Sequence, residues 1–114
     1  MEKNMEIIML MDFYGQLLTE KQYDALDMYY NQDLSLAEIA EESMISRQGA
    51  RDFIKKGEKL LNGYEEKLGL VKRFGDITKQ IGEMNEIIDR LKNDSNSAEI
   101  ERLKEISRNL SEEI

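Results

Sequence analysis

Residues 34–61 read LSLAEIAEESMISRQGARDFIKKGEKLL, and the fold that we expect for the chain is built around these residues. It has the pattern of two short helices joined by a tight turn. Ser35 is placed to cap the start of the first helix, and Glu38, three residues later, completes a capping box. Ser46 is placed to cap the second helix. This arrangement is typical of the helix-turn-helix motif, whose second helix enters the major groove of DNA.

Apolar side chains recur on one side of each of these two helices. In the first helix, Leu36, Ile39 and Ala40 fall on one face at helical spacing. The side of the second helix that we expect to be buried carries Ala50, Phe53, Ile54 and Gly57. Both helices are therefore expected to pack on a common core.

The outward side of the second helix carries the residues that point to nucleic acid. In this motif the N-terminal residues of the second helix reach the base edges. Arg makes paired hydrogen bonds to guanine and Gln to adenine, and Arg47 and Gln48 are neighbours here. The candidate DNA-binding residues are Ser46, Arg47, Gln48, Arg51, Lys55, Lys56 and Lys59. The same side chains also fit the solvated face of a structural helix, so both interpretations stay open.

Two residues in this stretch depart from the usual pattern. Met44 occupies the turn position at which many such motifs carry Gly, and a left-handed conformation strains other residues. Gly49 lies inside the second helix, where Gly costs about 1 kcal/mol relative to Ala. We therefore expect a strained turn and a loosened second helix.

The composition favours helices and excludes several kinds of chemistry. The 114 residues include no Pro, Cys or His, and Leu, Ile, Met, Glu and Lys dominate, so an all-α fold is favoured. Without Cys and His there is no disulfide, thiolate or zinc-finger chemistry, and we expect no catalytic residue, no cofactor and no metal site. No apolar run is long enough to span a membrane and no secretory signal is evident. We expect a cytoplasmic protein with no membrane partner.

The net charge of −8 opposes tight binding to DNA, because Lys and Arg drive that binding by releasing counterions from phosphates. The charge is uneven along the chain, however. Residues 46–60 contain five cations, Arg47, Arg51, Lys55, Lys56 and Lys59, against the two anions Asp52 and Glu58. A basic face on an acidic body fits weak or partner-dependent binding.

The chain before the motif predicts two further helices. Residues 1–17 become apolar nearly all round, as in a helix buried on several sides, in the core or at a subunit contact. Thr19 and Gln22 form another capping box, which predicts a helix that ends at about Asn31. We expect Tyr29 and Tyr30 on its inner face, packed in the core rather than offered as a stacking platform.

A long amphipathic pattern follows the motif. From Leu68 to Leu91 apolar residues recur every three or four positions, in a heptad-like stripe. A polar break follows at residues 92–97, and a last helix is expected after it. We therefore divide the chain into a head domain, residues 1–68, and a C-terminal amphipathic helical extension or hairpin, residues 69–114.

The heptad-like stripe has to be covered by the last helix or by another chain. Helix-turn-helix proteins commonly bind palindromic operators as dimers. We therefore expect a homodimer, formed through residues 1–17 or through residues 69–114.

Six short motifs occur in order along residues 10–74. They are Phe-Tyr-Gly at 13–15, Leu-Thr-x-Lys-Gln at 18–22, Tyr-Tyr at 29–30, Leu-Ser-Leu-x-Glu-Ile-Ala-Glu at 34–41, Ser-Arg-Gln at 46–48 and Tyr-Glu-Glu-Lys-Leu at 64–68. A chain with these motifs resembles the YlxM family of small bacterial helix-turn-helix proteins. Residues 75–114 match no motif of that family.

The resemblance implies a DNA-binding protein linked to the signal recognition particle pathway, because genes of the family lie beside those of the particle's protein subunit and receptor. The head also resembles region 4 of bacterial sigma factors, which binds promoter DNA. The implied fold is all-α, with a sigma region 4-like head that has no wing, followed by a long helix or a helical hairpin. This sequence departs from its relatives at Gly49 and Ala50, where Ala-Val is usual, and at Arg51 and Phe53.

Two functions from different classes remain, and an enzyme is disfavoured. The first is a non-enzymatic DNA-binding regulator of transcription, with the helix at about residues 46–61 in the major groove. The second is a protein–protein or ribonucleoprotein interaction module that keeps the sigma-like fold without reading DNA sequence, with signal recognition particle components as its partners. An enzyme is disfavoured because the sequence shows no nucleophile–base pair, phosphate-binding loop or metal cluster.

Overall fold

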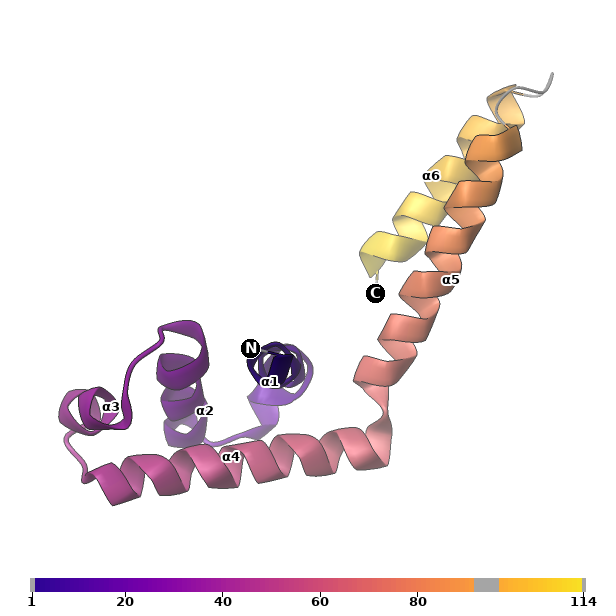
Figure 1. Cartoon of the computed structure of the whole chain (residues 1–114). Helices are drawn as coiled ribbons and strands as arrows, with labels where there is room; N and C mark the ends of the chain where they lie inside the picture. The colour runs from indigo at the N-terminus through magenta and orange to yellow at the C-terminus, as the bar shows by residue number, and fades with distance from the viewer. Residues whose placement is uncertain (1, 92–96, 114) are drawn as a thin grey trace. The chain divides into compact units, whose positions relative to one another are not determined.

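The computed structural model describes residues 2–91 and 97–113, and over these ranges it contains helices and no strand (Figure 1). The α-helices are α1 (Glu2–Tyr14), α2 (Glu20–Leu26), α3 (Leu36–Ser43), α4 (Arg47–Leu68), α5 (Leu70–Leu91) and α6 (Ser97–Glu113). A 3-10 turn, η1 (Gly15–Leu17), follows α1, and a π-helical segment, η2 (Asp27–Asn31), continues α2. The all-α prediction is confirmed. None of the described helices combines the length and apolar character that crossing a membrane requires.

Both predicted capping boxes are present. The Thr19 hydroxyl oxygen accepts from the Gln22 N–H at 3.2 Å, and the Gln22 side chain accepts from the Thr19 N–H at 3.1 Å. Ser35 and Glu38 exchange the equivalent bonds at 3.0 and 3.1 Å. The hydrogen bond from the Ser35 backbone, with a further contribution from the Ser35 side chain, holds the pKa of Glu38 below its usual value. The capping boxes, which are local features of the sequence, therefore fix the first residues of α2 and α3.

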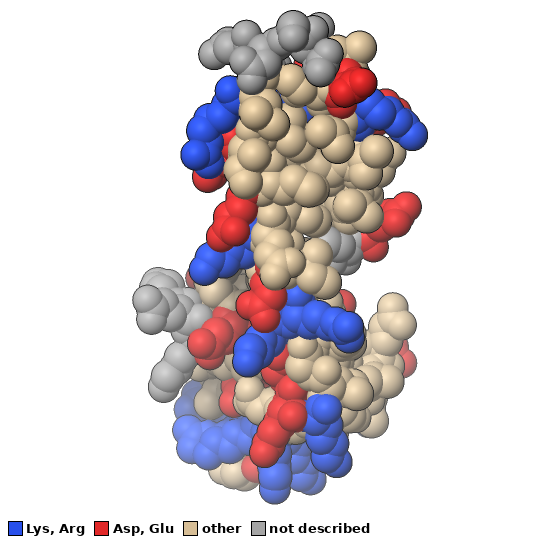
Figure 2. Space-filling model, turned by 90° about the vertical axis from the view of Figure 1, so that its right-hand side faces the viewer, with Lys and Arg blue, Asp and Glu red and all other residues tan. Residues whose placement is uncertain are grey.

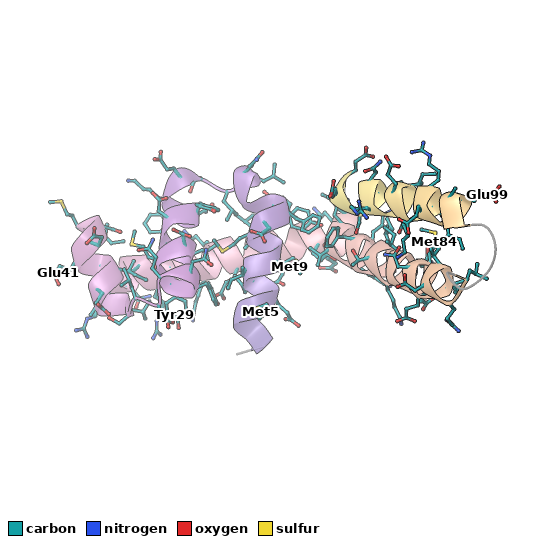
Figure 3. The ribbon with its side chains drawn as sticks, turned by 90° about the horizontal axis from the view of Figure 1, so that it is seen from above. Met5, Met9, Tyr29, Glu41, Met84 and Glu99 are labelled. Carbon is teal, nitrogen blue, oxygen red and sulfur yellow. The ribbon has the colours of Figure 1, made fainter. Side chains whose placement is uncertain are left out.

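The chain divides into two compact units, Met1–Val71 and Lys72–Ile114. In the first unit α3, α2 and α1 follow one another along one side of α4, beginning at its N-terminal end (Figure 1). The core between them is made of Ile7, Leu10, Met11, Tyr14, Ala25, Leu26, Ile39, Ala40, Ala50, Ile54 and Leu61. The predicted burial of the first helix is thus confirmed on one side, while Met5 and Met9, labelled in Figure 3, are 66% and 38% exposed.

α2 and α4 pack closely against each other in this unit. Gly57 of α4 is buried, and a Cβ atom at this position would lie 2.7 Å from Cδ1 of Leu26. Because Gly57 has no side chain, the fully buried Leu26 can lie directly against the α4 backbone. The predicted inner side of α4 is largely confirmed: Ala50 and Ile54 belong to the core, and Phe53 is half-buried beside it.

In the second unit α6 turns back along α5 to form a helical hairpin (Figure 1). Ile81, Ile88 and Ile100 are buried in it, together with Ser107, whose hydroxyl donates a 2.6 Å hydrogen bond to the Asn85 side-chain oxygen. Lys104 and Asp89 form an ion pair at 2.8 Å. Of the two predicted arrangements for the C-terminal part, the hairpin is the one observed. The predicted polar break at residues 92–97 lies, up to residue 96, outside the described residues.

Candidate nucleic-acid interface

The turn between α3 and α4 is formed by a methionine in the left-handed conformation. Met44 has φ 58° and ψ 43°, as its place in the sequence predicts. The Met44 N–H bonds the Glu41 carbonyl, and the next N–H, of Ile45, bonds the Ala40 carbonyl at 3.0 Å. These bonds satisfy carbonyls at the end of α3, and the half-buried Ile45 anchors the turn to the core. A left-handed conformation costs a residue with a Cβ about 1–2 kcal/mol.

Ser46 caps α4, as predicted. Its hydroxyl oxygen accepts a 2.9 Å hydrogen bond from the Gly49 N–H. Gly49 is therefore in the first turn of the helix, where the backbone is held by the cap as well as by helical hydrogen bonds. α4 continues without a break from Arg47 to Leu68, so the expected loosening by Gly49 does not interrupt the helix.

All of the predicted cations on α4 are exposed, on the side away from Ala50, Ile54 and Leu61. Blue side chains gather at the bottom of Figure 2, where α4 lies. Asp52 interrupts this basic face, and its carboxylate accepts a 3.0 Å hydrogen bond from the Gln48 amide. The amide N–H donors with which Gln48 would read a base are thus partly engaged within the helix.

A shallow hollow lies between the start of α4, the start of α3 and the segment η2. It is lined by Tyr29, Ser35, Leu36, Ala37, Arg47, Gln48 and Arg51. A second hollow shares Tyr29, Leu36 and Arg51 with the first, and is further lined by Tyr30, Ile54, Lys55 and Glu58. The structure therefore brings together the predicted residues Arg47, Gln48, Arg51 and Lys55. Lys56 and Lys59 line neither hollow.

Tyr29 is a residue of this surface that the sequence analysis missed. Its predicted place on the inner face is wrong, because the side chain is 38% exposed and lines both hollows (Figure 3). The reason is the π-helical segment η2, whose wider turn breaks the 3.6-residue spacing used to assign inner positions. Segments of this kind are frequent at functional sites, but this one is seen only in the structure, so the sequence carries no signal that singles out Tyr29.

Tyr30 holds η2 against α4, as its predicted packing role requires. Its ring meets that of Tyr29 edge to face, with centroids 5.0 Å apart, and its hydroxyl donates to the Glu58 carboxylate. Burial, and next the hydrogen bond to Glu58, raise the pKa of Tyr30. The Glu58 carboxylate, which lines the second hollow, is thereby engaged by Tyr30. The cations that line the two hollows are Arg47, Arg51 and Lys55.

No metal centre is indicated within residues 2–91 and 97–113, where no group of three or more Asp or Glu side chains is arranged to hold an ion. The surface around the start of α4 instead offers the charges of Arg47 and Arg51, their hydrogen-bond donors and the exposed ring of Tyr29. These are the groups that recognise phosphates and bases.

Comparison with known proteins agrees with the resemblance seen in the six motifs and extends it beyond residue 74, to which the motifs had limited it. The family model of UPF0122, described as "Putative helix-turn-helix protein, YlxM / p13 like", matches residues 1–109. A UPF0122 protein of Clostridium kluyveri is 45% identical over 104 residues, which are 91% of this chain and 94% of that protein. One of Acetivibrio thermocellus is 57% identical over 74 residues, 65% of this chain and 63% of its own length. The chain therefore belongs to the UPF0122 family of YlxM / p13-like helix-turn-helix proteins.

Proposed function

We propose that this chain is a non-enzymatic DNA-binding regulator of transcription, with the N-terminal half of α4 in the major groove. The observation that carries the proposal is the clustering of Arg47, Gln48 and Arg51 around one hollow at the exposed start of α4. In a helix-turn-helix these are the positions that reach base edges. The family's description as helix-turn-helix proteins supports the same assignment.

The remaining candidate residues contribute phosphate contacts in this proposal. Lys55, Lys56 and Lys59 are exposed along α4, and each phosphate that they neutralise releases counterions. Because the whole chain carries a charge of −8, this local basic face has to overcome repulsion from the acidic remainder. Binding is therefore expected to be weak without the matching sequence and steeply dependent on salt.

We further propose the roles that the resemblance implies for the two parts of the chain. The head domain, residues 1–68, acts as a sigma region 4-like DNA-binding unit, and the hairpin acts in assembly, so that a cytoplasmic homodimer binds two half-sites. The regulated function is tied to the signal recognition particle pathway.

A second candidate is an interaction module for a protein or a ribonucleoprotein, including components of the signal recognition particle. The observations that favour it are the net charge and the hydrogen bond that engages the Gln48 amide with Asp52. Both features weaken base reading, and neither hinders a contact made with protein.

Anisotropy titration with labelled fragments of the organism's own genomic DNA, at low and at physiological salt, separates the two candidates. For a regulator we expect salt-sensitive binding that persists at physiological salt for some fragments. The double variant Arg47→Glu/Arg51→Glu should lose it. The matched control is Lys79→Glu/Arg90→Glu, which makes the same charge change at exposed positions of α5 and should bind nearly as the unmodified chain does.

Two results would contradict the proposal. No binding at low salt, with full helicity in circular dichroism, would refute the DNA-binding proposal and favour the interaction module. Equal loss of affinity in both double variants would show that only net charge matters, and would remove the assignment of Arg47 and Arg51.

A further inference from the structure

The hairpin of α5 and α6 leaves a large apolar surface uncovered. Seven bulky apolar side chains of the two helices are between 36% and 52% exposed: Ile77, Met84, Ile87, Leu91, Leu103, Ile106 and Leu110. We call this set the open face. Figure 2 shows the same side of α5 and α6 as a continuous area without charged side chains, with Lys, Arg, Asp and Glu along its margins.

The open face follows a seven-residue repeat. On α5, Ile77, Met84 and Leu91 are spaced by seven, and on α6 Leu103 and Leu110 are spaced by seven. A second set with the same spacing, Ile81 and Ile88 on α5 with Ile100 and Ser107 on α6, is buried between the two helices. Both columns of α5 are apolar, and the buried column of α6 combines Ile100 with the hydrogen-bonded Ser107. Helices with two such columns pack on two neighbours, as in a four-helix bundle. The hairpin buries one column of each helix and leaves the other without a partner.

The other side of the hairpin is polar, which makes the contrast between its faces sharp. A shallow groove there is lined by Asn85, Asp89, Lys104, Arg108 and Ser111. A hairpin that packs on no partner has no need for bulky apolar residues concentrated on one exposed side. Exposed apolar patches of several hundred Å² mark interaction surfaces.

We propose that the open face binds the open face of a second copy of this chain, so that two hairpins form a four-helix bundle. A twofold contact brings the same surface of each copy together, and identical seven-residue spacings are then complementary by construction. The proposal deepens the proposed homodimer by assigning its interface, and it rests on that part of the proposed function. It does not depend on what the head binds.

The area of the open face is large enough for contact with a second copy of the chain. Seven side chains of this size at these exposures present roughly 500 Å² per copy, and two copies about 1,000 Å², which is the area that a specific interface needs. The charge is compatible as well, because residues 72–114 contain eight Lys or Arg and ten Asp or Glu, a net charge of −2. Two hairpins therefore repel one another little, whereas the acidic first unit carries most of the chain's −8.

The same observations disfavour α1 as the interface. Its apolar residues Ile7, Leu10, Met11 and Tyr14 are already in the core of the first unit. Met5 and Met9 are its only strongly exposed bulky apolar side chains among the described residues, which is too little area for a specific contact. Of the two surfaces that the sequence left open for dimerisation, the structure favours the hairpin.

The test is the mass of the full chain in solution, measured by sedimentation equilibrium between 1 and 100 µM. We expect the unmodified chain to reach twice its mass of 13.3 kDa within this range. The variant Ile87→Glu/Leu103→Glu places one charge on each helix of the open face, where burial in a dimer would leave it unpaired, so its dissociation constant should rise at least about 100-fold. The matched control Thr78→Glu/Ser111→Glu adds the same charge at exposed positions outside the open face and should remain dimeric.

Several results would overturn the proposal. They are a monomeric unmodified chain at 100 µM, a Glu variant that remains dimeric, and a control that dissociates as readily. If the Glu variant loses helicity in circular dichroism, sedimentation of Ile87→Ala/Leu103→Ala tests the interface instead. This variant only removes apolar area and should still weaken association. Anisotropy with DNA at low salt, run in parallel, keeps the two proposals apart. A monomer that binds DNA refutes the interface and the homodimer but leaves the DNA-binding function standing, and a dimer that does not bind DNA refutes only the DNA-binding function.

Discussion

The hydroxyl of Tyr14, at the end of α1, donates a 2.6 Å hydrogen bond to the carboxylate of Glu65, which lies 51 residues later in α4. The same tyrosine oxygen accepts from the Leu70 N–H at 3.1 Å, and the Glu65 carboxylate accepts from the Val71 N–H at 3.0 Å. The first N–H groups of a helix have no partner within it. Two side chains from different helices thus cap the start of α5, directly after the left-handed Gly69 that ends α4.

Tyr14 and Glu65 belong to two of the six family motifs, Phe-Tyr-Gly at 13–15 and Tyr-Glu-Glu-Lys-Leu at 64–68. Replacing Tyr14 by Phe keeps the ring and removes the hydroxyl, which leaves the Leu70 N–H without its acceptor. We expect the free energy of unfolding to fall by about 1–2 kcal/mol, measured by urea denaturation. Tyr23→Phe is the control, because that ring is 37% exposed and should change stability by less than about 0.5 kcal/mol. Equal effects of the two substitutions would contradict the capping role.

Alkaline pH should destabilise the first unit through its two engaged tyrosines. Burial, followed by the hydrogen bond to Glu65, raises the pKa of Tyr14, and burial followed by Glu58 raises the pKa of Tyr30. A raised folded-state pKa contributes stability that is fully present below the unfolded value, about 10 for Tyr, and is lost as pH rises toward the folded value. We expect urea denaturation at pH 8 and pH 11 to show a smaller loss for Tyr14→Phe/Tyr30→Phe than for the unmodified chain. If stability fell equally between pH 8 and pH 11 in the variant and the unmodified chain, the two tyrosines would not be the cause.

Two glycines of α4, six residues apart, should respond in opposite directions to alanine. A methyl group at Gly57 would lie 2.7 Å from Leu26 Cδ1, so Gly57→Ala has to displace a fully buried side chain and should destabilise by about 1–3 kcal/mol. A methyl group at Gly63 meets nothing within 4 Å, so Gly63→Ala should stabilise by about 0.5–1 kcal/mol through helix propensity. Thermal unfolding of both variants checks the pair. A stabilised Gly57→Ala would mean that α2 and α4 can separate without cost.

Replacing Met44 by Gly in the turn of the helix-turn-helix is expected to raise the free energy of unfolding. Met44 has φ 58° and its side chain is 91% exposed, so Met44→Gly relieves strain without removing buried area. We expect a stabilisation of about 0.5–1 kcal/mol after the larger backbone entropy of unfolded Gly is taken into account. Gly69, with φ 62°, is the reciprocal control, and Gly69→Ala should destabilise by about 1 kcal/mol. Denaturation midpoints that move in the same direction for both variants would refute this account.

Tyr29 should contribute to DNA binding if the hollows at the start of α4 face the duplex. Tyr29→Ala removes a ring that borders Arg47 and Arg51, and we expect it to weaken binding about fivefold to tenfold, which corresponds to one lost contact. Tyr23→Ala removes a ring of nearly the same exposure elsewhere in the first unit and should leave the affinity within about twofold. Anisotropy titration at low salt measures both. Unchanged affinity in Tyr29→Ala would place the bound nucleic acid away from the hollows.

Most local features of the fold could be read from the sequence, because each depends on residues three to five positions apart. The capping boxes at Thr19 and Ser35, the cap at Ser46 and the left-handed Met44 are all of this kind. The exposed basic side of α4 followed from the same helical spacing. Tyr29 was misplaced because η2 departs from that spacing, and nothing in the local sequence announces the departure.

Propensity, capping and periodicity act within a few residues, so they were enough to predict the all-α class, the starts of α2, α3 and α4, and the exposed basic side of α4. The remaining relations came from the packed structure. It brought Tyr14 to Glu65, pressed Leu26 onto Gly57, gathered Tyr29 with Arg47 and Arg51, and showed which apolar residues of α5 and α6 have no partner. These relations join residues far apart in the chain, and their energy comes from burial and hydrogen bonds that exist only once the helices have packed.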